Sequence, residues 1–258
     1  MTEIHNTAIV SPKAKIGNDI KIAPYAIIHD DVEIGDNCFI GPYAVVYDGA
    51  RIGNNVIIHQ SASVSNVPQD LKFCNEKTYF YIGDNTTIRE FVTLHRGTGE
   101  GGFSKIGDNC LIMAYVHVPH DCVIGSNVII ANTVQIAGHV EIDDWVIIGG
   151  ITAIHQFCKI GKHSMIGGGF KVTQDVPPFI IAGREPLRYM GLNVVGLRRR
   201  GFSNDDISTL KNAYDMFYNS GVNFSQAKEK IKETYGDVPV VKELLDFFAR
   251  SNRGIIRK

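Results

Sequence analysis

A six-residue repeat constrains the fold of this chain more than any other feature. Counted in steps of six from Ile4 to Val172, 26 of the 29 positions are Ile, Val or Leu, and the exceptions are Asp70, Glu76 and Glu100. The residue two places earlier is typically small and apolar, which fits a short strand with two inward side chains. Gly followed by Asp or Asn often comes next, and these residues favour turns. Each hexad therefore predicts one short strand and one corner.

The repeat predicts a solenoid of stacked coils. Six residues are too few to reverse direction and pair with themselves, so successive coils must pair as parallel strands. Three sides would give 18 residues per coil. The repeat stops after Val172, and Pro177-Pro178 precedes a region with helical spacing of apolar residues. We expect a parallel β-helix over residues 1–176 and an α-helical domain over residues 177–258 that covers exposed strand edges.

Two polar windows, 65–81 and 95–105, interrupt the repeat and are expected to be loops that leave the solenoid at corners. The step from Val64 to Ile82 is 18 residues, which we interpret as one whole coil, so that the core resumes in phase. Long loops in a compact repeat are usually functional. A tolerated insertion is the alternative interpretation.

The composition indicates an ordinary globular chain. It has 258 residues, is 44% hydrophobic and 21% charged, and has a net charge of −1, which gives no signal for nucleic-acid binding. Residues 1–10 lack the features of a signal peptide, and no apolar stretch approaches the roughly 20 residues of a membrane span. We expect a cytoplasmic protein without an integral membrane segment. Four of the five cysteines occupy the small inward slot of the repeat and are expected in the core, namely Cys38, Cys110, Cys122 and Cys158.

A cluster of histidines follows from counting in coils of 18. His120, Gly138 and Gln156 fall in one column, with Asp121 and His139 in the next and His155 beside Gln156; His95 and His117 lie shortly before them. A positioned histidine is the usual general base near neutral pH, and a backbone N–H such as that of Gly138 can hold an oxyanion. Asp121 could orient the ring of His120.

Zinc binding is the competing interpretation of the same histidines. His95, His117 and His120 resemble the three-histidine zinc set of γ-class carbonic anhydrases, which share this type of fold, and zinc needs its ligands within about 2.1 Å of one point. The spacing does not closely match that set, so we expect no metal.

Several stretches resemble the UDP-N-acetylglucosamine O-acyltransferases, a family of hexapeptide-repeat acyltransferases that makes the first acylated precursor of lipid A. They cover nearly the whole chain: 69–72, 95–97, 117–122, 137–140, 155–158, 174–178, 191–193 and 198–202. The resemblance implies a left-handed parallel β-helix and a homotrimer with active sites between subunits. A corner rich in His and Gly offers half a cleft, which a cyclic partner would close.

The resemblance also implies roles for individual residues. His120 would take the proton from the sugar 3-hydroxyl, which attacks the thioester of acyl carrier protein, while Asp121 supports the base and Gly138 holds the oxyanion. The donor is a phosphopantetheine thioester, so no separate cofactor is expected. Gly168 occupies the position that sets acyl length, and a glycine there predicts a long 3-hydroxyacyl chain. The residues expected to bind UDP-N-acetylglucosamine are Gln69, Asp70, Lys72, His95, His117, His139, His155, Gln156, Asn193, Arg199 and Arg200.

Two further alternatives remain. The related glucosamine N-acyltransferases usually carry a uridine-binding domain before the β-helix, whereas the repeat here begins at Ile4. A non-catalytic β-helical scaffold would need neither the histidine cluster nor the basic run Arg198–Arg200.

Overall fold

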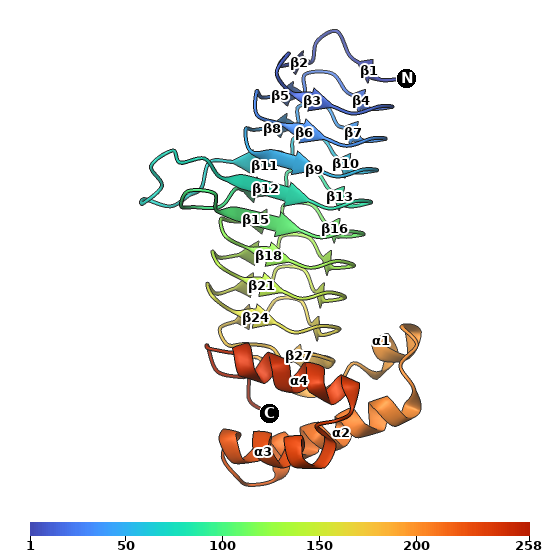
Figure 1. Ribbon diagram of the computed structural model, residues 1–258, viewed down its shortest axis with the longest axis vertical. Coiled ribbons are helices and arrows are strands. Elements are labelled where there is room, and N and C mark those ends of the chain that lie inside the picture. Colours follow the sequence, from blue (N-terminus) through green and yellow to red (C-terminus); the bar gives the residue numbers. More distant parts are fainter.

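The chain forms a three-sided parallel β-solenoid with four helices at its C-terminal end (Figure 1). The computed structural model describes residues 1–258. None of the helices combines the length and the apolar character that crossing a membrane requires. The predicted parallel solenoid and helical C-terminal region are confirmed, and the left-handed sense stays a prediction.

The first sheet contains β1 (Glu3–Ile4), β4 (Lys21–Ile22), β7 (Phe39–Ile40), β10 (Ile57–Ile58), β13 (Thr87–Ile88), β16 (Leu111–Ile112), β19 (Ile129–Ile130), β22 (Ile147–Ile148), β25 (Met165–Ile166), β27 (Ile180–Gly183) and β28 (Arg188–Leu192). The second contains β2 (Ile9–Val10), β5 (Ile27–Ile28), β8 (Val45–Val46), β11 (Ser63–Asn66), β14 (Thr93–His95), β17 (His117–Val118), β20 (Gln135–Ile136), β23 (Ala153–Ile154) and β26 (Lys171–Val172). The third contains β3 (Lys15–Ile16), β6 (Glu33–Ile34), β9 (Ala50–Ile52), β12 (Tyr79–Ile82), β15 (Phe103–Ile106), β18 (Val123–Ile124), β21 (Glu141–Ile142) and β24 (Lys159–Ile160).

The repeat positions stack in register and form the core. Ile112 pairs with Ile130 in the first sheet, for example, and Ile124 pairs with Ile142 in the third. Both sets of side chains are almost fully buried. The four cysteines predicted in the core are buried too, and all five cysteines are free. Burial raises the pKa of the Cys122 thiol to about 12, so this group is a packing residue and not a nucleophile.

The corner between the third and first sheets is built by a ladder of short polar side chains, and we call it the ladder corner (residues 17–20, 35–38 and their repeats to 161–164). At each step a backbone N–H donates to the side-chain oxygen one coil further on, at 2.7–3.0 Å. The acceptors are Asp36, Asn54, Asp84, Asp108, Ser126 and Asp144. The turn chemistry of the hexad thus satisfies the backbone of its neighbour.

The corner between the second and third sheets carries both insertions, and we call it the loop corner (residues 29–32, 47–50, 65–78, 95–102, 119–122, 137–140 and 155–158). The first loop, residues 67–78, joins β11 to β12 and projects from the side of the prism (Figure 1). The second loop, residues 96–102, joins β14 to β15. The strands therefore extend into the windows expected at 65–81 and 95–105.

The interpretation of the step from Val64 to Ile82 as a whole coil is wrong. Val64 lies in the second sheet, and Ile82 pairs with Ile52 in the third, so the step advances the chain by only one side. The extra residues form the first loop and not a further coil. The core nevertheless resumes in phase because the insertion is a multiple of six.

The third corner, between the first and second sheets, is the aromatic corner (residues 23–26, 41–44 and their repeats to 167–170). Tyr25 stacks on Tyr43 with ring centroids 5.0 Å apart, and Phe91 stacks on Tyr115 at 5.1 Å. All four rings are more than 40% exposed. This edge therefore presents a column of apolar surface to its surroundings.

The first sheet continues beyond residue 176 as β27, and the antiparallel β28 follows it. The helices are α1 (Val194–Arg199), α2 (Asn204–Asn219), α3 (Phe224–Tyr235) and α4 (Pro239–Arg250). Ser203 and Asp206 form a capping box at the start of α2. The C-terminal tail is fixed to the last coil by buried Asp175, whose carboxylate accepts hydrogen bonds from Lys159, Ser251, Asn252 and Arg253.

Candidate active site

A hydrogen-bonded histidine–carboxylate pair lies on the loop corner directly below the two loops. His120 and Asp121 follow β17, and Nδ1 of His120 lies 2.8 Å from Oδ2 of Asp121. Both side chains are about 15% exposed. Since the Nδ1 hydrogen points to the carboxylate, Nε2 is the nitrogen left to accept a proton from another molecule.

Gly138 lies against the ring of His120, one coil further along. A Cβ atom at position 138 would lie 2.8 Å from Cε1 of His120 and 3.0 Å from Nε2, so only glycine allows this ring position. The N–H of Gly138 is buried and donates no hydrogen bond within the protein, whereas the equivalent N–H groups of the ladder corner are paired. It is therefore a donor without a partner, next to the free nitrogen of His120.

The spacing of 18 residues per coil correctly predicts which residues stack at this corner. His139 donates its N–H to the carbonyl of His120, and Phe157 donates its N–H to the carbonyl of Gly138. The ring of His139 packs edge-on against His120 and stacks on Phe157, with centroids 4.7 Å apart in the second pair. A cavity of about 460 Å³ opens beside Asp121, His139 and Phe157.

Two further histidines form the side of the site nearer the first loop. Nδ1 of His95 lies 2.6 Å from the carbonyl of Val67, and His117 pairs with Thr93 at 2.8 Å. Burial, followed by the neighbouring His95 and His120, lowers the pKa of His117 to about 4. Burial also lowers the pKa of His95, although its bond to Val67 opposes this. His117 is therefore neutral at pH 7 and can recognise a hydroxyl without carrying charge.

Known proteins resemble this chain over its full length. Two enzymes called acyl-[acyl-carrier-protein]–UDP-N-acetylglucosamine O-acyltransferase, from Burkholderia lata and Thiobacillus denitrificans, are 51% and 50% identical to it, and the alignments cover all of each chain. The crystal structure of a UDP-N-acetylglucosamine acyltransferase from Bacteroides fragilis has a TM-score of 0.96 at 46% identity, covering 98% of this chain and 100% of that one. The enzyme of that name from Francisella novicida also gives 0.96, at 38% identity, covering 99% of this chain and 94% of that one.

Family profiles agree. Residues 175–256 match the second domain of UDP N-acetylglucosamine O-acyltransferase, and residues 13–46, 31–66 and 103–138 match bacterial transferase hexapeptide repeats. The chain belongs to the UDP-N-acetylglucosamine O-acyltransferase family. The resemblance drawn from the sequence is thus confirmed, whereas the comparisons assign no role to individual residues.

The remaining predicted residues of this acyltransferase lie away from His120 or point elsewhere. Gln69, Asp70 and Lys72 lie on the projecting first loop, where Gln69 and Lys72 are exposed. Two coils beyond His120, His155 and Gln156 are exposed, and Nδ1 of His155 lies 3.1 Å from the carbonyl of Gln156.

The predicted nucleotide residues are near the C-terminal end of the ladder corner. Asn193 is the buried N-cap of α1 and donates to the carbonyl of His163, so its amide is already used within the fold. Arg200 lies over the ring of Trp145, and its Nη1 is 3.4 Å from Nδ1 of His163. Arg199 is exposed.

Gly168 stands on the aromatic corner and not on the loop corner. A Cβ atom there would lie 3.0 Å from the carbonyl oxygen of Gly150, one coil earlier. Within one chain, the predicted base and the predicted acyl-length position therefore belong to different edges of the prism.

The possible metal ligands that lie close together differ from the three-histidine zinc set considered in the sequence analysis. The side chains whose potential ligand atoms gather within 4.8 Å are His120, Asp121 and His139, without His95 or His117. The carboxylate of Asp121 already accepts hydrogen bonds from the backbone and side chain of Thr98 and pairs with His120. This arrangement favours the hydrogen-bonded pair over a cation site.

Sequence reasoning missed two residues of the acyltransferase site. Phe157 could have been found, because it is one coil of 18 after His139. Thr98 left no such signal, since it lies in an insertion where the repeat cannot assign a neighbour.

Proposed function

We propose that the protein transfers a 3-hydroxyacyl chain from acyl carrier protein to the 3-hydroxyl of UDP-N-acetylglucosamine, the first step of lipid A biosynthesis. The observation that carries the proposed mechanism is the pair His120–Asp121 beside the unpaired N–H of Gly138. A base and an oxyanion donor next to each other are what acyl transfer requires.

In the proposed reaction, Nε2 of His120 takes the proton from the sugar 3-hydroxyl as its oxygen attacks the thioester carbonyl. The imidazolium that forms is stabilised by Asp121, which is held on Nδ1. The N–H of Gly138 donates to the oxyanion of the tetrahedral intermediate. The carbon–sulfur bond then breaks, and His120 returns the proton to the phosphopantetheine sulfur. Ester and free carrier thiol result, with atoms and charge balanced.

The sugar nucleotide would lie along the loop corner. Neutral His117 suits a sugar hydroxyl, and His139, His155 and Gln156 extend the polar surface beyond His120. His95 is buried and would support the ring of His117, against which it packs edge-on. Gln69, Asp70 and Lys72 would approach from the first loop. Arg199 and Arg200 lie by the ladder corner, so they would meet the diphosphate from a neighbouring protomer of the proposed trimer, since guanidinium groups match phosphate oxygens. Asn193 would fix the helix that carries Arg199.

The working enzyme is proposed to be a homotrimer. Two observations support this: His120 and Gly168 lie on different corners, and the aromatic corner exposes stacked rings that a partner's surface would cover. An acyl chain activated at one protomer's loop corner would then run along the next protomer's aromatic corner, where Gly168 leaves room for a long chain. We expect a trimer mass by light scattering. A monomer with full activity would contradict this.

The carrier protein would dock on a basic cavity of about 760 Å³ between β28 and α2. Its lining includes the apolar side chains of Met190, Leu192 and Ile207 and the carboxylate of Asp215. Five cations line it and can meet an acidic partner, although Arg188 already donates to the terminal carboxyl oxygen of Lys258 at 2.8 Å. These cations are Arg184, Arg188, Arg198, Lys211 and Lys258.

We also propose a cytoplasmic location. The chain has five free cysteines and no disulfide, which suits a reducing compartment, and acyl carrier protein is the proposed donor.

The test is an acylation assay with UDP-N-acetylglucosamine and 3-hydroxyacyl carrier proteins of ten to sixteen carbons, with product mass as readout. The wild type should prefer the long chains because position 168 lacks a side chain. His120→Ala should lower the rate by roughly 10²–10⁴-fold for every donor, the usual contribution of a positioned base. Undiminished transfer by His120→Ala would exclude His120 as the base. Preference for a ten-carbon donor would contradict only the chain-length proposal.

A further inference from the structure

The second loop returns to the loop corner and binds the carboxylate of Asp121 through Thr98. The N–H of Thr98 donates to Oδ1 at 2.9 Å, and its hydroxyl donates to Oδ2 at 2.6 Å. Oδ2 is also the oxygen 2.8 Å from Nδ1 of His120. Thr98 therefore determines both the plane and the position of the group that holds the His120 ring.

A second histidine competes for the same oxygen. Nε2 of His139 lies 3.7 Å from Oδ2 of Asp121, and the two histidine rings pack edge to face at 5.2 Å. A free carboxylate could rotate about its χ2 angle towards His139, because this terminal torsion has broad minima. Two hydrogen bonds from one residue, one to each oxygen, restrict that rotation and keep Oδ2 on His120.

The charge of Asp121 depends on the same contacts. Burial by itself would raise the pKa of Asp121, but the hydrogen bonds from the side chain and backbone of Thr98 are the main opposing contributions. With a smaller contribution from His120, the pKa of Asp121 is lowered below its ordinary value of 3.8. The carboxylate thus stays ionised where it orients and stabilises the base.

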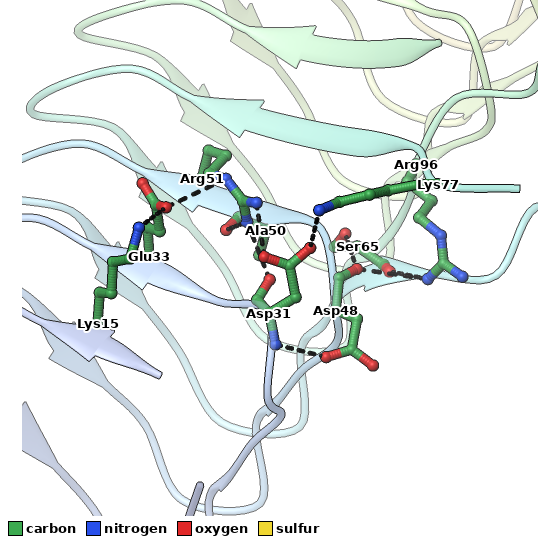
Figure 2. Close-up of polar contacts among 9 residues, drawn as sticks. All are labelled: Lys15, Asp31, Glu33, Asp48, Ala50, Arg51, Ser65, Lys77 and Arg96. Atoms are coloured by element: carbon green, nitrogen blue, oxygen red, sulfur yellow. Dashed lines mark hydrogen bonds and ion pairs between the residues drawn. The ribbon is translucent and has the colours of Figure 1, made fainter. Parts of the chain in front are cut away.

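The loop that carries Thr98 is itself firmly attached. The guanidinium of Arg96 donates from Nη1 to the carbonyls of Ser65 and Asp48, at 3.2 and 3.4 Å, and lies over the ring of Phe73 in the first loop (Figure 2 shows the carbonyl contacts). The N–H of Gly99 donates to the carboxylate of Glu76, also in the first loop, at 2.9 Å. The second loop is therefore joined to the first on one side and to Asp121 on the other.

The root of the first loop is fixed to the preceding coils. Lys77 lies 3.7 Å from Asp31, and Arg51 pairs with the same carboxylate at 2.7 Å, as Figure 2 shows. The guanidinium of Arg51 also lies over the ring of Tyr79. The side chain of Arg51 is only 17% exposed, so its pair with Asp31 is a half-buried support, whereas Lys77 is 61% exposed and adds a surface ion pair.

We propose that Thr98 is a positioning residue of the acyl transfer, which acts through Asp121 to hold His120 in its reactive orientation and joins both loops of the corner to the base. The proposal rests on the roles proposed above for His120 and Asp121. Thr98 differs from the residues predicted to bind substrate because its contacts are with the carboxylate of Asp121.

The experiment is a double-mutant cycle on the full-length protein, read as kcat, KM for the sugar nucleotide and the pH profile of kcat. Thr98→Val should lower kcat by roughly 10- to 100-fold, the usual value of a hydrogen bond to a charged group, with little change in KM. Thr98→Ser keeps the hydroxyl and should restore most of the activity. In an Asp121→Asn background, Thr98→Val should cost less than about twofold, because the two changes remove the same function.

The pH profile distinguishes positioning from a folding defect. Without the hydroxyl, Oδ2 of Asp121 accepts one hydrogen bond fewer and stabilises the imidazolium of His120 more strongly. The acid limb of kcat, which reports protonation of the base, should therefore move to higher pH in Thr98→Val, whereas a smaller active fraction would only scale the profile. Glu100→Ala is the matched control, since Glu100 is exposed on the same loop and makes no contact with Asp121; its activity should equal that of the wild type. The melting temperature of each variant checks the fold.

Three outcomes would overturn the proposal: full activity and an unshifted profile in Thr98→Val, an equal loss in Thr98→Ser, or the same factor lost with and without Asp121. Failure of the proposed function is separate, because it appears as transfer that survives His120→Ala. An inactive His120→Ala together with a fully active Thr98→Val would reject only the role of Thr98.

Discussion

The ladder corner and the loop corner are built from the same hexad, yet they have opposite polar chemistry. On the ladder corner, the N–H of Asp36 donates to Asn54 one coil on, and the pattern repeats up to Asp144. On the loop corner, the equivalent N–H of Gly138 has no acceptor within the protein. One edge satisfies its own backbone, and the other leaves a donor for a different molecule.

This difference shows how a repeat gains a site without a new fold. The backbone path is nearly the same on both corners, as the left-handed φ of 60° at both Asn127 and His139 indicates. Only the side chains at the corner change: short oxygen acceptors on one edge, and His, Asp and Gly on the other. The loops are inserted at the loop corner, where one bond of the ladder type joins Asp31 to Asp48 but the long run of such bonds is missing.

The largest effect within this comparison is expected for Gly138→Ala. The added methyl group would lie 2.8 Å from Cε1 of His120, so the ring must leave its place above the unpaired N–H. A displacement of this size between base and oxyanion donor should lower kcat by roughly 10²–10³-fold. Steady-state kinetics would measure it, with the melting temperature expected to change little because the ring can move towards solvent.

Ser126→Ala is the matched control on the ladder corner of the neighbouring coil. Its hydroxyl accepts the N–H of Asp108 at 3.0 Å, and its removal should cost about 1 kcal/mol of unfolding free energy. The rate should be unchanged, since Ser126 is on the edge away from His120. Two results would contradict this contrast between the corners: a Gly138→Ala variant that loses stability but keeps its rate, or a Ser126→Ala variant that loses rate but keeps its stability.

The sequence predicted most of the fold and the stacking at the site, because both follow from a period. The inward Ile and Val residues, the buried cysteines and the column of His120, Gly138 and Gln156 all depend on counting by six or eighteen. At the two insertions, which interrupt the six-residue repeat, the sequence no longer predicted which residues are neighbours. The step from Val64 to Ile82 is interpreted as a whole coil, which it does not form. One side of the solenoid with a loop of twelve extra residues has the same length in sequence as a coil of 18. Thr98 could not be predicted for the same reason.

The resemblance carried a different kind of information. It indicated Asn193 and Arg200, which no period could select, but it gave no account of how each is used within the protomer. The amide of Asn193 caps α1 and bonds to His163, and Arg200 lies on Trp145. Both contribute to packing at the end of the prism, and only contacts in three dimensions show this.

The ladder corner itself changes character where it meets the helices. The short residues with left-handed φ give way to Trp145, His163 and Phe179, whose rings stack at 6.1 and 5.7 Å. His163 is buried, with Arg200 and Lys162 as the nearest cations and Asp144 as the nearest carboxylate. Burial first, and these two cations next, lower its pKa from 6.5 to about 4. The corner thus exchanges a hydrogen-bonded ladder for a neutral aromatic stack.

This exchange makes the stability of the stack sensitive to acid. The site on the loop corner is tested by its rate, whereas the stack is tested by its stability. The unfolded chain binds a proton at His163 near pH 6.5 and the folded chain only near pH 4, so its contribution to stability is complete above pH 6.5 and is lost as the pH falls to 4. The loss should be roughly 2–3 kcal/mol. His163→Phe keeps an aromatic ring in the stack but cannot be protonated. In denaturant unfolding at pH 7.5, 5.5 and 4.5, its free energy of unfolding should therefore fall less with acid than that of the wild type, while His95 and His117 still contribute to the fall. An unchanged decline in His163→Phe would mean that the stack tolerates the charged ring and that the aromatic end of the corner is no more sensitive to acid than the ladder.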